Sequence, residues 1–393
     1  MSASRRPAGA WRWAAVLRSP HRLGFLGGAA VLCMASLWWA WCLWEPGLAP
    51  LTWPASLIHA VVMGFGFLPL FFAGFLFTAG PRWLHVPAVP ARMLLWPVST
   101  LVLSWALFLW GAHVRTDIAA LAVMAGALSW GWITWRLAQL LRSSEERDRF
   151  HVRLITWACA SGTLAWALVA AGLWQCEPTW VRAALGWGLW GFLMPVFVIA
   201  ADRMMPVFSL VRLRWLGDRG VVLALLGVCL IQGGHAATRA VGMDGGPVLT
   251  MTQSWLSSLA GVVVLGMAWH WSEVQNMRLR MLAMLNVGVL WLGLALMLPS
   301  GSLASVHALT MGFMGSVWLA MVSRVSSTHA GRSIAADQIT WGLFWAMQLA
   351  TGLRVAAALL PTMQQSLWVA AASLWLGVVG AWAWRHARWW GRA

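Results

Sequence analysis

The dominant pattern along this chain is a series of long apolar runs, separated by short breaks that carry proline, glycine or charge. A helix that crosses the hydrocarbon core of a bilayer needs about 20 mostly apolar residues. Twelve runs meet that length. They cover residues 23–44, 57–80, 93–112, 118–141, 153–175, 180–201, 220–241, 252–271, 281–299, 303–323, 338–360 and 366–385. The pattern predicts an all-α polytopic membrane protein, in which residues 1–393 form one transmembrane domain that begins with a basic segment, 1–22.

The composition supports that class and excludes a soluble domain. Hydrophobic residues make up 61% of the chain, the mean hydropathy is +0.72 and only 10% of residues are charged, against about 25% in soluble proteins. The five cysteines show no metal-ligand spacing, and most lie inside apolar runs, where cysteine behaves as a small hydrophobic residue. We expect no disulfide framework.

The net charge of +16 comes from arginine alone, because every basic residue of the Lys+Arg total of 27 is an arginine. These arginines lie in short loops between apolar runs, so the positive-inside rule explains them better than nucleic-acid binding does. If the N-terminus is cytoplasmic, all but four arginines face the cytoplasm. The exceptions are Arg115, Arg182, Arg239 and Arg354. Both termini are therefore predicted to be cytoplasmic, and no nucleic-acid partner is expected.

One histidine-led phrase occurs twice. The stretch IHAVVMGFGF covers 58–67, and VHALTMGFMG covers 306–315. The alternation of spans places both His59 and His307 near the outer face of the membrane. Neutral imidazole is a common ligand of iron and copper, and two histidines on separate helices can hold a haem between them. The glycines that follow each histidine would let a flat macrocycle or a neighbouring helix approach closely.

Methionine follows each of these histidines at the fourth position. Met63 and Met311 therefore share a helix face with His59 and His307. A histidine–methionine pair is a soft site suited to Cu(I). The alternative is that the methionines only fill space between helices.

Other histidines are predicted at the same membrane face. His235 lies near the outer end of the seventh run, one turn before Arg239, and His113 closes the third run. Arg239 could pair with a haem propionate or extend to the interface, and either histidine could instead be an interfacial polar residue. The acidic residues all lie at or near the ends of runs, which argues against a proton-coupled carrier.

A second group of basic residues is predicted on the cytoplasmic side. It consists of Arg203 at the end of the sixth run and of Arg324, His329 and Arg332 at the end of the tenth. A positive pocket there could bind an anion or a carboxylate arm. The alternative is that these charges only set the topology.

Three stretches together resemble the NnrS family. They are IHAVVMGFGFLPLFFAGFLFTAGPRWLHVP at 58–87, ADRMMPVFSLVRL at 201–213 and VHALTMGFMGSVWLAMVSRVSSTHAGRSI at 306–334. Members of that family are twelve-span bacterial membrane proteins linked to the nitric oxide response of denitrifying bacteria, and they are reported to carry haem and copper. The motif positions carried over to this chain are His59, Met63, Arg203, Pro206, His307, Arg324, His329 and Arg332.

The chain departs from the family wording where further metal ligands are usual. Val61 and Val62 stand where a second histidine and a glutamate are common, and Asn286 stands where many members have histidine. These departures favour haem, of the b type, over copper as the cofactor.

The resemblance implies a haem-binding protein of the bacterial inner membrane that acts in the response to nitric oxide and nitrosative stress. Two alternatives stay open. One is a haem or metal transporter, or an assembly factor for a respiratory or denitrification complex. The other is an enzyme that reduces nitric oxide, which the lack of intramembrane carboxylates argues against. No catalytic residue is assigned, and the resemblance leaves enzyme activity open.

Overall fold

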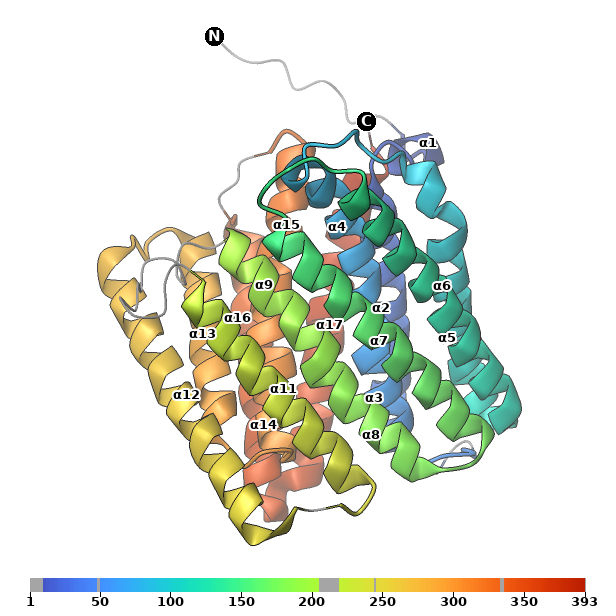
Figure 1. Ribbon diagram of the computed structural model, residues 1–393. Coiled ribbons are helices and arrows are strands. Elements are labelled where there is room, and N and C mark those ends of the chain that lie inside the picture. The colour runs from blue at the N-terminus through green and yellow to red at the C-terminus, as the bar shows by residue number, and fades with distance from the viewer. Residues whose placement is uncertain (1–9, 48–49, 205–218, 244, 333–335, 393) are drawn as a thin grey trace.

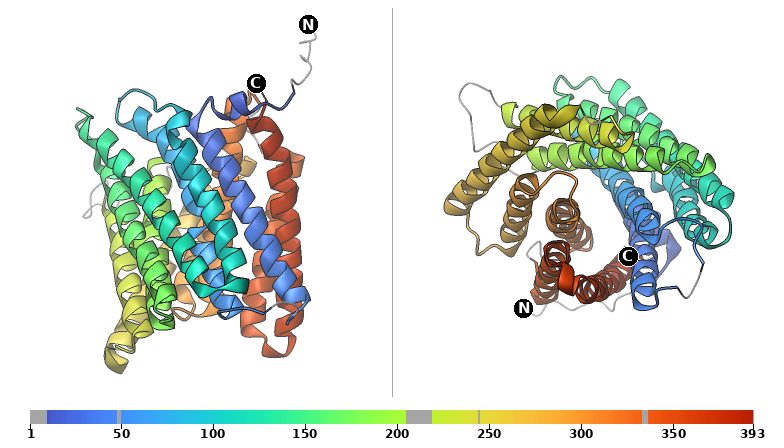
Figure 2. Two further views of the ribbon diagram at one scale, coloured as in Figure 1. Left: turned by 90° about the vertical axis from the view of Figure 1, so that its right-hand side faces the viewer. Right: turned by 90° about the horizontal axis from the view of Figure 1, so that it is seen from below.

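Helices account for the regular structure of this protein in the computed structural model, which describes residues 10–47, 50–204, 219–243, 245–332 and 336–392 (Figure 1). No strand occurs in those ranges. Twelve of their helices are long and apolar enough to cross a membrane, so the predicted polytopic fold is confirmed and its surroundings are a lipid bilayer. The N- and C-terminal ends lie at the same end of the bundle, here named the terminal end (Figures 1 and 2).

The spans are numbered 1 to 12 in chain order, and most consist of one helix. The single-helix spans are α2 (Pro20–Trp44), α6 (Thr116–Arg142), α7 (Phe150–Trp174), α11 (Gly220–Ala240), α12 (Gly246–Val274), α13 (Arg280–Met297) and α16 (Gln338–Leu359). Span 3 is η1 (Ala91–Leu94) with α5 (Leu95–Val114), and span 12 is η4 (Pro361–Met363) with α17 (Gln364–Trp390). A short helix, α1 (Trp13–Val16), precedes span 1.

Several helices extend beyond the apolar runs that predict them. The eighth run was expected over 252–271 and its helix is Gly246–Val274; the twelfth was expected over 366–385 and its span is Pro361–Trp390. Helical hydrogen bonding continues past the hydrocarbon core into polar surroundings, whereas hydropathy detects only the apolar part.

Spans 2, 6 and 10 form the centre of the bundle, and among the described spans these three are interrupted between two α-helices. Their buried shares are 78%, 72% and 72%, against 22% for span 8. Span 2 breaks between α3 (Ala55–Phe65) and α4 (Leu68–Trp83). Span 6 contains the π-helix η2 (Leu189–Leu193) between α8 (Pro178–Gly188) and α9 (Met194–Met204). Span 10 contains the π-helix η3 (Ala308–Met314) between α14 (Leu303–His307) and α15 (Gly315–His329). Short π-helical turns occur frequently at functional sites.

Spans 1 and 2 approach closely where two glycines meet. A Cβ atom added to Gly24 of α2 would lie 2.6 Å from the Cα atom of Gly74 of α4. Small residues at such crossings allow two backbones to touch without loss of packing. This contact fixes α2 against span 2 and therefore positions the side chains of both helices.

Candidate cofactor site

The two histidines of the repeated phrase come together in the structure. His59 lies on α3 and His307 ends α14, both at the end of the bundle opposite to the terminal end (Figure 1). The two imidazoles are close enough to interact electrostatically, and each keeps some accessible surface. They form a pair of ligand-type side chains, supplied by two of the three most enclosed spans.

An indole fixes the ring of His59. The ring of Trp39, on α2, stacks on the imidazole with centroids 4.1 Å apart and planes inclined by 23°. The Nδ1 atom of His59 is buried and has no hydrogen-bond partner among the described residues. A buried polar atom without a partner is costly, so a donor or acceptor from outside the chain would stabilise this arrangement.

A backbone hydrogen bond fixes the tautomer of His307. Its Nδ1 atom lies 2.7 Å from the carbonyl oxygen of Leu303. A carbonyl only accepts, so Nδ1 carries the proton and Nε2 of the neutral ring keeps a lone pair. Histidines that ligate metals through Nε2 usually donate their other ring N–H to such an acceptor.

Arg354 joins this pair, although its sequence position indicates only a span end. It lies on α16 and interacts electrostatically with both His59 and His307. Its Nη1 atom is buried and has no hydrogen-bond partner in the described part of the chain. The guanidinium carbon lies over the ring of Trp368 of α17, 5.3 Å from its centroid. The site therefore contains two imidazoles and one positive charge.

The small residues after each histidine admit protein side chains. A Cβ atom on Gly312 would lie 2.5 Å from the indole of Trp291 on α13, and one on Gly64 would lie 3.7 Å from Leu185 of α8. The distance at Gly64 is ordinary van der Waals contact, so only Gly312 shows the close approach of a neighbouring helix that was one of the two uses predicted for these glycines. The flat group beside Gly312 is an indole.

Met63 and Met311 lie one turn beyond the histidines and are partly exposed. Met63 continues the α-helix of His59, whereas Met311 lies in the π-helix η3. The four-residue spacing therefore has different geometry in the two spans, because a π-turn contains more residues than an α-turn. The backbone therefore does not place the two histidine–methionine pairs in the same relative orientation.

His235 and Arg239 lie near the C-terminal end of α11, at the same membrane face. Helix α11 contacts α8, and α8 in turn contacts α3. His235 is partly exposed and Arg239 is exposed.

His113 is a structural residue. The indole N–H of Trp38 donates to its Nε2 atom over 2.9 Å, and its Nδ1 atom lies 3.1 Å from the carbonyl oxygen of Pro50. Because Nε2 accepts, Nδ1 must donate, so both ring nitrogens are used. Of the two interpretations of His113 from the sequence, the interfacial polar residue fits these contacts.

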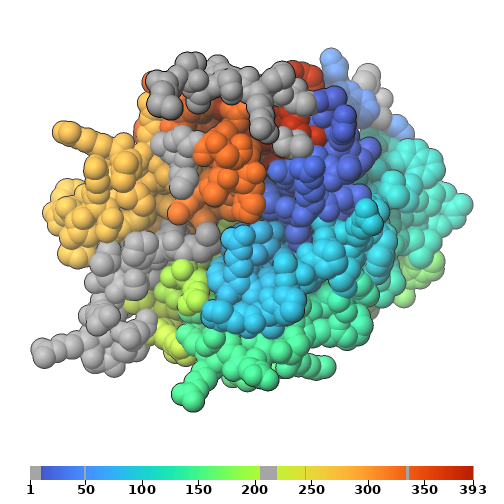
Figure 3. Space-filling view, turned by 90° about the horizontal axis from the view of Figure 1, so that it is seen from above, coloured from blue at the N-terminus to red at the C-terminus, as the bar shows by residue number. Residues whose placement is uncertain are grey.

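The terminal end holds a second histidine contact. The rings of His329 and His21 lie 4.2 Å apart between centroids, where the start of α2 meets the end of α15 (Figure 3). Arg22 beside them is buried, and its guanidinium donates to the carbonyl oxygens of Ala15, Trp390 and Arg392. The buried charge is thus satisfied by backbone oxygens that close this end of the bundle.

The other basic residues predicted for this end are spread out. Arg203 and Arg324 are exposed, and the guanidinium of Arg332 lies over the ring of Trp389, 4.6 Å from its centroid. Pro206 lies outside the described residues. The described contacts do not join these arginines in one pocket with His329.

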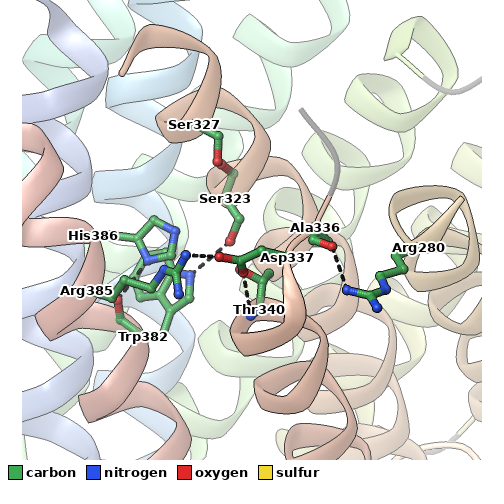
Figure 4. A network of polar contacts seen from close by, with 9 residues as sticks. All are labelled: Arg280, Ser323, Ser327, Ala336, Asp337, Thr340, Trp382, Arg385 and His386. Atoms are coloured by element: carbon green, nitrogen blue, oxygen red, sulfur yellow. Dashed lines mark hydrogen bonds and ion pairs between the residues drawn. The ribbon is translucent and has the colours of Figure 1, made fainter. Parts of the chain in front are cut away.

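An acidic residue fixes the start of α16 at the same end (Figure 4). Asp337 accepts a hydrogen bond from the backbone N–H of Thr340 over 2.9 Å and pairs with Arg385 of α17. Nearby, the indole of Trp382 donates to Ser323 over 3.1 Å. Partial burial acts to raise the pKa of Asp337, but the hydrogen bonds from Thr340 and Arg385 outweigh it and hold the pKa below its ordinary value.

The sequence profile of one family, described as NnrS protein, matches residues 15–393. The chain belongs to the NnrS family. No match was found among curated proteins. Membership of the NnrS family points to a role in the response to nitric oxide.

Six of the eight NnrS motif positions lie in the three interrupted spans, whereas Arg332 follows the end of α15 and Pro206 lies outside the described residues. His59 precedes the break in span 2, His307 precedes the π-helix of span 10, and Arg203 follows the π-helix of span 6. The departures Val61 and Asn286 are buried, and the Oδ1 atom of Asn286 has no hydrogen-bond partner among the described residues. A histidine at either position would have faced protein interior, whereas this chain offers apolar surface at Val61 and an amide at Asn286.

Proposed function

We propose that this chain is a haem-binding protein of the bacterial inner membrane that acts in the response to nitric oxide. His59 and His307 are the residues that hold the haem, at the end that the arginine distribution assigns to the periplasm. The observation that carries the proposal is the pairing of these two imidazoles, one with a lone pair at Nε2 and the other with an unsatisfied Nδ1.

The set of donors fits haem better than a free metal ion. Within the described ranges, no three histidine, cysteine, aspartate or glutamate side chains gather as a metal-ion group. Structural and catalytic zinc sites use three or four protein ligands, whereas haem iron needs only one or two because the macrocycle supplies the others. Two neutral imidazoles inside a membrane bundle match the one or two protein ligands that haem iron needs.

The chain contributes binding, orientation and exclusion of water. Trp39 orients His59 by stacking, and the bond to Leu303 orients His307. The spans that supply the two histidines are apolar and largely buried, which suits a sparingly soluble macrocycle and a small uncharged ligand. Bound haem supplies the affinity for nitric oxide. Copper is the weaker candidate, because Val61, Val62 and Asn286 replace the additional ligands.

The test is a visible spectrum of protein purified in detergent from haem-replete cells, with metal analysis. We expect a Soret band and haem that stays bound at a fixed ratio. His59→Ala and His307→Ala should each lose haem or change its spin state, whereas His113→Ala should keep the spectrum. Absence of a Soret band from the unmodified protein would refute haem binding. Weakly held haem, together with a respiratory-complex maturation defect on deletion, would favour transport or assembly.

A further inference from the structure

Arg354 carries a positive charge within a membrane span, and the group that balances this charge has to be identified. It lies in α16, which forms the span Gln338–Leu359. Its side chain is partly exposed, but its Nη1 atom is buried. Charged groups at membrane depth are costly and are normally paired. The contact with Trp368 covers one face of the guanidinium but provides no acceptor in its plane, because aromatic rings attract cations through their faces.

No acidic side chain neutralises this charge in the described ranges. The acidic residues that form ion pairs there are Asp117, Glu146, Asp148, Asp202 and Asp337, and none of them pairs with Arg354. Its helix α16 packs against α14, which His307 ends, and Arg354 interacts electrostatically with both His59 and His307. Neutral imidazoles do not neutralise a guanidinium, so an anion that enters beside the histidines would complete this arrangement.

We infer that Arg354 binds a carboxylate of the molecule that His59 and His307 hold. This inference rests on the proposed haem function, and it assigns Arg354 to a propionate side chain of the haem. A guanidinium and a carboxylate form short, charge-assisted hydrogen bonds, often two in parallel. Such a contact would satisfy Nη1 and neutralise the intramembrane charge. It would also orient the macrocycle, because the propionates occupy one edge only.

The experiment compares two porphyrins that differ only at the carboxylates. Haem-depleted protein in detergent is titrated with haem and with haem dimethyl ester, and binding is followed by absorbance. The unmodified protein should bind haem more tightly than the ester, by about tenfold to a hundredfold, the range for a hydrogen bond to a charged group. Arg354→Gln should reduce that ratio to about one, while its affinity for the ester stays unchanged.

Controls separate this inference from the proposed function and from misfolding. Arg182→Gln removes an exposed arginine of α8 at the same membrane face and should preserve the discrimination. Arg354→Lys keeps the charge and should retain part of it. If Arg354→Gln still prefers haem over the ester as strongly as the unmodified protein does, the role of Arg354 is overturned. The proposed haem function is not affected by that result. Failure of the unmodified protein to bind either porphyrin would overturn the haem function, and this inference with it.

Discussion

The indole of Trp39 stacks on the imidazole of His59, with ring centroids 4.1 Å apart and an interplanar angle of 23°. The two residues come from adjacent spans that are held together by the glycine contact between α2 and α4. A stacked indole restricts rotation of the imidazole, so the direction of its nitrogen lone pair is set before any ligand arrives. This restriction is a form of preorganisation, which improves binding by reducing the entropy lost.

Replacement of Trp39 tests that preorganisation. We expect Trp39→Ala to weaken haem binding by about tenfold, since an aromatic pair contributes about 0.5–1.5 kcal/mol. Trp39→Phe should retain most of the affinity, because a phenyl ring can still stack. Absorbance titration measures both. Trp174→Ala, at an exposed tryptophan of α7, is the control and should bind haem normally; equal affinities of Trp39→Ala and the control would contradict the role of the stack.

Replacement of His113 is expected to affect stability and not haem binding. His113→Ala removes the bonds to Trp38 and Pro50 and should lower the free energy of unfolding by about 1–3 kcal/mol. The haem spectrum should not change, because both nitrogens of His113 serve the fold. Thermal unfolding in detergent checks stability and absorbance checks the haem. Loss of haem at an unchanged melting temperature would show that His113 belongs to the cofactor site.

The stability of the start of α16 should depend on pH through Asp337. Its pKa is lowered in the folded state, so the ionised carboxylate stabilises the fold. That contribution is complete above the unfolded pKa, about 4, and is lost as the pH falls through the lower folded value. Melting temperatures between pH 7 and pH 3 should fall less for Asp337→Asn than for the unmodified protein. Glu45→Gln, at an exposed carboxylate of the opposite end, should follow the unmodified curve, and identical curves for all three proteins would contradict the prediction.

The crossing of spans 1 and 2 should not accept a methyl group. A Cβ atom at Gly24 would overlap the backbone of Gly74 at 2.6 Å, so Gly24→Ala should destabilise the protein by about 1–3 kcal/mol. The matched control is Gly377→Ala, at a helical position with open space around the added atom. The control should be neutral or more stable by up to about 1 kcal/mol. Equal melting temperatures for the two variants would show that the helices separate without cost.

The candidate site was only partly predictable. The repeated phrase indicated His59 and His307 and their depth, because depth follows from position within a span. Arg354 appeared only as an arginine near a span end. Its proximity to the histidines depends on how span 11 packs beside span 10, and no local pattern encodes that. The tautomer of His307 depends on a contact with Leu303 one helical turn earlier, and the sequence does not show which ring nitrogen faces that carbonyl.

The sequence by itself determined the twelve spans, their alternating direction and the shared end of the two termini. These features follow from hydropathy and from the number of crossings, both of which are local or additive along the chain. Tertiary structure decided which spans are central, where Gly312 meets Trp291 and which charge lies beside the histidine pair. The physical reason is that lipid and protein interiors are both apolar, so hydropathy alone does not distinguish a lipid-facing helix surface from one that packs against another helix.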